Sequence, residues 1–211
     1  LALVALAAAL ALTGLAALSA MPAGASHPSA PVQQGTEVEG SIVTDTVWTP
    51  AGNPYHAIRS VTVNEGVSLT IESGVVVEFG ETSTLRVRGS LMVKGSAPGD
   101  VVFTSDKPEK ARGDWPTVEI NSEDGGADIR GLTIRYAGRN NRSALRFLEG
   151  TMRVDGVHIE DTDAGGVYID GKSTALRNVT VVNSAAEGIR VDQSASDEPQ
   201  TRVELVNVTL R

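Results

Sequence analysis

Apolar and polar residues alternate with a period of two along most of the chain from residue 40 onward. The apolar positions fall in runs of four to six residues, and breaks such as Gly66, Gly74 and Pro98-Gly99 separate these runs. A period of two places successive side chains on opposite faces of a β-strand, and glycine or proline breaks end strands. No segment beyond residue 25 has the apolar stripe of an amphipathic helix. The pattern therefore predicts an all-β chain of many short strands.

Strand-like runs also recur at a fixed spacing in the second half of the chain. Leu145, Val167 and Ile189 begin three related runs and lie 22 residues apart. Two further types of run recur in step with them, one at Leu132, Val157, Val179 and Val208 and the other at Val154, Leu176 and Leu205. Three strand types cycling with a period of about 22 residues are typical of a right-handed parallel β-helix with three sheets. A sandwich or a barrel would not keep the three phases in step.

The repeat predicts the direction of each side chain and its neighbours on adjacent coils. The inward stack comprises Leu145, Val167 and Ile189, and the outward row comprises Arg146, Tyr168 and Arg190. Among outward charges, the repeat places Asp155 beside Arg177 and Arg135 beside Glu160, as salt bridges between coils. Asp161 and Asn183 occupy equivalent turn positions, where side-chain amides can form hydrogen-bonded ladders.

The two ends of the chain differ from this repeat. Residues 1–25 contain 11 Ala and 7 Leu and end in a small-x-small motif, while the first charged residue is Glu37. This run predicts a signal peptide cleaved after Ala25, and the alternative is a membrane anchor. We expect a flexible lead-in over 26–39, an N-terminal cap over 40–60, and a β-helix over 61–211 that continues past residue 211.

Composition narrows the classes of function. The chain has 211 residues and no cysteine, which excludes disulfides and cysteine-ligated metal or haem sites. Its formal net charge of −8 argues against nonspecific binding to nucleic acid or to anionic lipid. We expect no nucleic-acid partner and no membrane span after signal cleavage.

Several short motifs in the first part of the chain resemble a known superfamily. The motifs are Trp48, Pro54-Tyr55, the run EGVSLTIESG at 65–74, the Gly-Ser-Leu at 89–91, Phe103-Thr104-Ser105 and Gly113-Asp114-Trp115. Over about residues 40–120 the chain resembles the opening of right-handed β-helix segments in secreted bacterial and archaeal proteins of the pectin-lyase-like superfamily. The resemblance implies this fold and export. It does not imply one activity, because a fold does not determine a function.

Paired carboxylates are the first candidates for chemistry. Asp170 and Asp192 occur 22 residues apart at matched strand ends, so they should lie about 5 Å from each other on adjacent coils. Enzymes of the superfamily act on acidic polysaccharides, some with Ca²⁺ held by carboxylates. One interpretation is therefore a weak Ca²⁺ site at Asp170 and Asp192, and no other cofactor is expected. The alternative is a pair of solvated turn carboxylates with Lys172 or a nearby arginine as counter-charge.

A second candidate site is the outward row. Arg146, Tyr168 and Arg190 would place a phenol ring between two guanidinium groups, a contact worth about 0.5–1 kcal/mol each when exposed. Such a row could bind an anionic polysaccharide, or it could be an ordinary surface ladder.

Two hypotheses of function follow. The first is a non-catalytic secreted or cell-surface module with a structural, adhesive or polysaccharide-contacting role. The second is the N-terminal part of a secreted carbohydrate-active enzyme, a polysaccharide lyase or glycoside hydrolase. The first is favoured because the sequence holds no motif that brings carboxylates and a basic residue together. We therefore expect residues 26–211 alone to turn over no polysaccharide.

Overall fold

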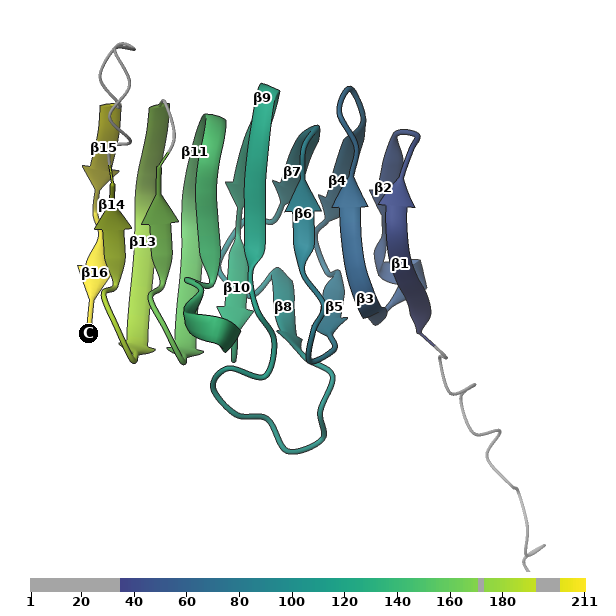
Figure 1. Ribbon diagram of the computed structural model, residues 1–211, viewed down its shortest axis with the longest axis horizontal. Helices are drawn as coiled ribbons and strands as arrows, with labels where there is room; N and C mark the ends of the chain where they lie inside the picture. Colours follow the sequence, from purple (N-terminus) through teal and green to yellow (C-terminus); the bar gives the residue numbers. More distant parts are fainter. Residues whose placement is uncertain (1–34, 171–172, 193–201) are drawn as a thin grey trace, which may run out of the picture. The chain divides into compact units, whose positions relative to one another are not determined.

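The computed structural model describes residues 35–170, 173–192 and 202–211, which form a parallel β-solenoid (Figure 1). The strands are β1 (Thr36–Ile42), β2 (Thr46–Trp48), β3 (Tyr55–Val63), β4 (Ser68–Glu72), β5 (Val76–Phe79), β6 (Leu85–Val87), β7 (Ser90–Lys94), β8 (Val101–Ser105), β9 (Val118–Arg130), β10 (Leu132–Arg135), β11 (Leu145–Thr162), β12 (Val167–Ile169), β13 (Ser173–Ser184), β14 (Ile189–Val191), β15 (Arg202–Val206) and β16 (Thr209–Leu210). Two short 3-10 turns, η1 (Pro50–Gly52) and η2 (Arg139–Asn141), are the only helical elements in the described ranges. The predicted all-β parallel architecture is confirmed.

The strands stack into three ladders, which we call faces A, B and C. Face A contains 40–42, 61–63, β6, 118–120, 145–147, β12 and β14. Face B contains β2, β4, β7, 126–130, 151–155, 173–177 and β15. Face C contains 36–38, 55–57, β5, β8, β10, 157–162, 179–184 and β16. Long strands such as β9, β11 and β13 bend from one face into the next.

The predicted register in the second half is confirmed. Leu145 pairs with Val167, and Val167 pairs with Ile189, each 22 positions further along the chain. The number of residues between register neighbours is larger at another point of face A, where Leu85 pairs with Val118. Spacing therefore changes from turn to turn, while the pairing stays parallel throughout.

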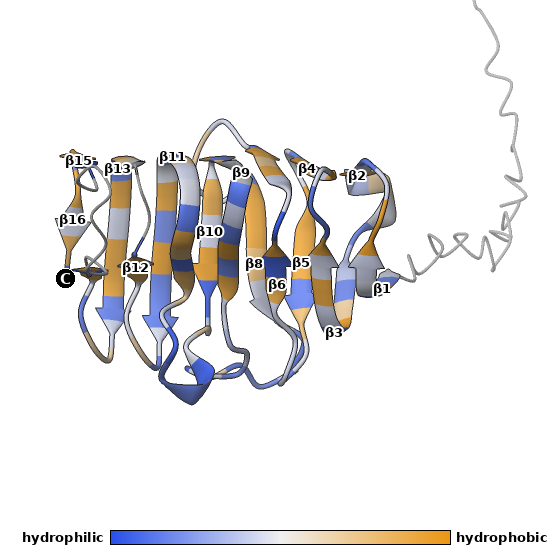
Figure 2. Cartoon of the chain, turned by 45° about the horizontal axis from the view of Figure 1, so that its top comes forward, coloured by the Kyte–Doolittle hydropathy of each residue, from blue (hydrophilic) through white to orange (hydrophobic). Residues whose placement is uncertain are grey.

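Alternation along each strand builds one continuous core, and Figure 2 shows the apolar and polar bands that result. Leu145 and Phe147 are completely buried on face A, and Val167 is 1 % exposed. In the first turn Trp48 stacks on Tyr55, with ring centroids 4.9 Å apart. Full burial of a valine, leucine, isoleucine or phenylalanine side chain contributes about 1.5–3 kcal/mol, so the inward rows of apolar side chains dominate the stability of the solenoid.

Strand pairing begins earlier in the chain than residue 61. β1 pairs in parallel with β3, starting with Thr36 opposite Tyr55. The first turn of the solenoid thus contains the segment predicted as a cap (40–60) and the end of the predicted lead-in (26–39). The predicted signal peptide, residues 1–25, lies outside the described residues.

Sharp corners between faces B and C are made by single residues with positive φ. Gly131, Gly156, Asn178 and Asn207 have φ of 63°, 65°, 51° and 54°. Asparagine tolerates this conformation better than most side chains do. Its amide also links the turns: Asn178 Nδ2 donates to Asp155 Oδ1 at 2.7 Å, and Asn207 Nδ2 donates to Asn178 Oδ1 at 2.7 Å.

The predicted amide contact at a second corner is present too. Asn183 Nδ2 donates a hydrogen bond to Asp161 Oδ1. Both residues have positive φ, at 59° and 54°. Side-chain ladders therefore accompany the backbone ladders at two corners of the solenoid.

Residues 106–117 leave the solenoid between β8 and β9 and form the long loop visible in Figure 1. Trp115 anchors the loop: it is fully buried, stacks on Phe79 at 4.2 Å, and donates its indole N–H to the Arg135 carbonyl at 2.8 Å. The Asp114 carboxylate is also buried and accepts from Lys107 Nζ at 3.0 Å and from the Ala111 N–H at 2.8 Å. We call residues 106–117 the face C–A loop.

Candidate functional site

The outward row of face A has the arrangement that the sequence predicted. Tyr168 pairs in register with Arg146 on one side and with Arg190 on the other. The guanidinium carbons lie 5.4 Å and 6.0 Å from the centroid of the Tyr168 ring. The ring therefore lies between two cations, and both contacts are within cation–π range.

Both arginines also have carboxylate partners. Arg146 Nη1 lies 2.5 Å from Glu119 Oε2, and Arg142 donates to the same oxygen at 3.2 Å. Arg190 Nη2 lies 2.9 Å from Asp192 Oδ2. The Arg190 side chain is 55 % exposed against 22 % for Arg146, so Arg190 presents more of its guanidinium to solvent.

The two carboxylates predicted as a Ca²⁺ site follow the ends of β12 and β14. Their backbone N–H groups donate to the carbonyls of Phe147 and Ile169 on the preceding turns, so Asp170 and Asp192 occupy equivalent positions. The Arg190 guanidinium, by hydrogen bonding and charge, and the Tyr168 hydroxyl together hold the pKa of Asp192 below its ordinary value. Burial of the phenol and the charges of Asp170 and Asp192 raise the pKa of Tyr168.

Asp192 is therefore already neutralised by a fixed cation. In the part of the chain that the structure describes, no group of three or more acidic, histidine or cysteine side chains is arranged to hold a metal ion. A Ca²⁺ ion on Asp170 and Asp192 remains a prediction, and it would have to compete with Arg190 for the second carboxylate.

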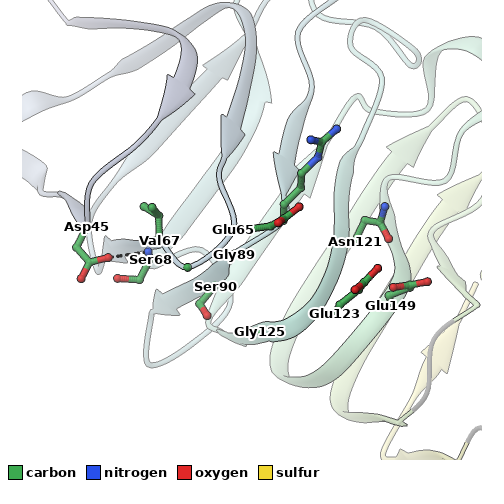
Figure 3. Close-up of a pocket in the computed structure, with 12 residues that line it drawn as sticks. Asp45, Glu65, Val67, Ser68, Gly89, Ser90, Asn121, Glu123, Gly125 and Glu149 are labelled. Atoms are coloured by element: carbon green, nitrogen blue, oxygen red, sulfur yellow. Dashed lines mark hydrogen bonds between the residues drawn. The ribbon is translucent and has the colours of Figure 1, made fainter.

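A polar hollow of about 490 Å³ lies at the corner between faces A and B, a feature that sequence reasoning missed. Its lining comprises Asp45, Glu65, Gly66, Val67, Ser68, Arg88, Gly89, Ser90, Asn121, Glu123, Gly125 and Glu149. Figure 3 shows Asn121, Glu123 and Glu149 projecting close together at one end, with Asp45 beside Ser68 at the other. We call this feature the corner hollow.

Glycines shape the floor of the corner hollow. A Cβ on Gly89 would lie 2.1 Å from the Val67 carbonyl oxygen, and one on Gly125 would lie 2.4 Å from the Gly89 carbonyl oxygen. Successive turns can stack closely here only without side chains, which leaves space above the backbone. The volume is within the range of small-molecule sites.

Carboxylate and amide oxygens give the corner hollow its chemistry. Asp45 accepts a hydrogen bond from the Ser68 N–H at 2.8 Å, and this bond lowers the pKa of Asp45. Glu65, Glu123 and Glu149 supply three more carboxylates, with Arg88 as the cation of the lining. Such a lining can accept hydrogen bonds from hydroxyl-rich ligands. A signal in the sequence existed, because each of the four carboxylates follows a face A strand by two or three residues.

Comparisons with known proteins add little to this geometry. No family model and no solved structure matches the chain. A segment of 71 residues is 35 % identical to Protein bark beetle from Drosophila melanogaster. The match covers 33 % of this chain and 2 % of that protein, so the chain spans a very small part of the relative's length. Among the described residues, no helix is long and apolar enough to cross a membrane.

Proposed function

We propose that the chain is part of a secreted or cell-surface right-handed β-helix of the pectin-lyase-like type, with a non-catalytic structural, adhesive or polysaccharide-contacting role. The observation that carries this proposal is the row of Arg146, Tyr168 and Arg190 on face A. The two arginines are oriented before a ligand binds, because each contacts the Tyr168 ring and pairs with a carboxylate, Glu119 for Arg146 and Asp192 for Arg190. Binding to such a row therefore costs little side-chain entropy.

The chemistry of the row suits an anionic polysaccharide. A guanidinium has five N–H donors, and Arg190 uses its Nε and Nη2 on Asp192. Its remaining donors can bind a sugar carboxylate or hydroxyl. The Tyr168 ring between the two guanidiniums keeps them separated and oriented.

Binding of the purified chain to a panel of acidic and neutral polysaccharides tests this contact. We expect acidic members to bind and the variant Arg146→Gln with Arg190→Gln to weaken that binding by at least about tenfold, or roughly 1.4 kcal/mol. Arg59→Gln is the matched control, because Arg59 is a highly exposed arginine that pairs with Glu39 away from this row. Equal binding by the double variant and the control would contradict the face A contact.

Export is the second part of the proposal, and it is supported by the uncharged run over residues 1–25. Mass spectrometry of the protein made in its own cells should find Ser26 as the first residue. A product that retains residues 1–25 and stays in the membrane fraction would contradict cleavage.

The alternative function is the N-terminal part of a carbohydrate-active enzyme. The corner hollow favours it, because Glu123 and Glu149 project together and glycosidases act through two carboxyl groups (Figure 3). An assay for reducing or unsaturated sugars separates the two functions. We expect no release, whereas release that disappears in Glu123→Gln or Glu149→Gln would establish the enzyme and overturn the non-catalytic role.

A further inference from the structure

Face B carries a line of shallow hollows that the face A proposal does not use. The first, of about 360 Å³, is lined by Met92, Val93, Lys94, Gly95, Asp128 and Arg130. The second, of about 510 Å³, shares Asp128 and Arg130 with the first. The third, of about 210 Å³, shares Arg153, Ala175 and Glu204 with the second. The hollows therefore follow one another across β7, β9, β11, β13 and β15, which are successive strands of this ladder (Figure 1).

The acidic groups in these hollows already have partners on the face. Asp128 accepts from Arg130 through both oxygens, at 3.0 Å and 2.9 Å. Glu204 accepts from Arg177 at 2.8 Å. The third carboxylate of the lining, Asp155, accepts a hydrogen bond from the Asn178 side-chain amide at the corner between faces B and C.

Three cations of the same hollows are left over. Among the described residues Lys94, Arg153 and Arg202 have no ion pair or side-chain hydrogen bond, and all three are exposed. Glu72 is the register neighbour of Lys94, but it lies outside the lining of the hollows. Once the internal pairs are formed, the charge that the hollows offer to a ligand is therefore positive.

The three free cations lie on a straight diagonal of the ladder. Lys94 on β7 pairs in register with Arg130 on β9, which pairs in register with Asp155 on β11. Arg153 precedes Asp155 by two residues, so the step from Lys94 to Arg153 crosses two strands and moves back by two residues. From Arg153 the same step leads through Ala175 to Arg202. Strands lie about 4.8 Å apart and residues rise about 3.3 Å, so each step is about 12 Å between Cα atoms.

We infer that face B is a binding surface for a linear anionic polysaccharide that carries one charged group per disaccharide repeat. Such a chain places its charges at about the interval of the three cations, within the reach of long, exposed side chains. Nucleic acid fits less well, because each strand carries one charge per nucleotide, which in duplex DNA is one charge per about 3.4 Å of helix axis. The inference rests on the proposed polysaccharide-contacting role, but it assigns a different face and a defined class of ligand.

Binding of hyaluronan oligosaccharides, which carry one carboxylate per disaccharide, tests this surface. We expect each of Lys94→Gln, Arg153→Gln and Arg202→Gln to weaken binding by about threefold to fivefold, and the triple variant by more than about twentyfold. Binding should weaken as ionic strength rises. Arg177→Gln is the matched control, because Arg177 is exposed on the same face but paired with Glu204. Melting temperatures check that the variants are folded.

Parallel measurements separate this inference from the face A proposal. Loss of binding in the triple variant with retention in Arg146→Gln plus Arg190→Gln supports face B and overturns the face A contact. The opposite result overturns face B and leaves the face A contact standing. Absence of binding to any acidic polysaccharide overturns both. Tighter binding of oligogalacturonate, with a carboxylate on every sugar, or of oligo-dT would overturn the assigned charge spacing.

Discussion

At the scale of single residues, position in the ladder decides which side chains are neighbours but not which of them pair. Arg135 and Glu160 are register neighbours and form the predicted ion pair. Arg177 was predicted to pair with Asp155 and does not, because it binds Glu204 on the following turn. Asp155 instead accepts from the Asn178 amide. Each outward charged side chain has direct neighbours on the two adjacent turns and diagonal neighbours two residues away on those turns. The repeat alone does not show with which of these neighbours it forms an ion pair.

Tyr168 provides a prediction at this scale. Tyr168→Ala removes two cation–π contacts and should lower the free energy of unfolding by about 1–2 kcal/mol. Tyr168→Phe keeps the ring and should change it by less than about 0.5 kcal/mol. Denaturant unfolding followed by circular dichroism measures both values. Equal losses in the two variants would show that the hydroxyl, and not the ring between Arg146 and Arg190, stabilises the row.

At the scale of elements, the face C–A loop shows how a long connection is kept ordered. Its apolar anchor is Trp115 against Phe79, and its polar anchor is the buried carboxylate of Asp114. Burial raises the pKa of Asp114, but the hydrogen bonds from Ala111, Lys107 and Ser105 lower it by more. The net effect is a pKa below the ordinary value, so the folded state favours the ionised carboxylate.

This lowered pKa predicts a pH dependence of stability. The contribution of Asp114 is fully present above the unfolded-state pKa of about 3.9 and is lost as the pH falls through the lower pKa of the folded state. Asp114→Asn should lower the free energy of unfolding at neutral pH by about 1–3 kcal/mol, because the variant loses the ion pair with Lys107 and keeps one acceptor oxygen where the carboxylate has two. The variant should also lose less stability than the parent protein between about pH 4 and pH 2.

Urea unfolding at several pH values measures this dependence. Asp100→Asn serves as the control, because it removes a carboxylate that accepts two backbone N–H groups in a turn that is only partly buried. A parallel acid response of the parent and Asp114→Asn would refute the assigned role of the buried carboxylate.

At the scale of the whole molecule, each turn contacts only the turns beside it, so stability should vary along the solenoid. Inward residues of β7–β10 such as Ile129 and Leu132 are fully buried, whereas Val191 on β14 is 43 % exposed and Leu210 on β16 is 53 % exposed. We expect amide hydrogen exchange to be slowest in β7–β10 and fastest in β14–β16. Exchange measured by mass spectrometry, repeated in mild denaturant, checks this gradient. Uniform protection along the solenoid would instead indicate a single cooperative unit.

The parts of the structure that the sequence predicted are the parts that repeat. Alternation and the 22-residue spacing of Leu145, Val167 and Ile189 act over neighbouring turns, so they predict strands, pairing and inward or outward direction. The corner hollow was missed because five turns contribute to it at unequal spacings in the chain. The first turn departs from the regular pairing, because β1 pairs with β3 through a register shift between Val38 and Gly40.

Strand pairing continues in register on both sides of the face C–A loop, and this determines where insertions can be tolerated during evolution. Leu85 and Val118 are register neighbours although the long face C–A loop lies between them in the sequence. Leu145 and Val167 are register neighbours in the same way with no such loop between them. The cost of closing a longer loop grows only with the logarithm of its length. Insertions and deletions at this corner therefore leave the buried rows in register. We expect new surface loops to be acquired here one at a time, while the stacked strands persist beneath them.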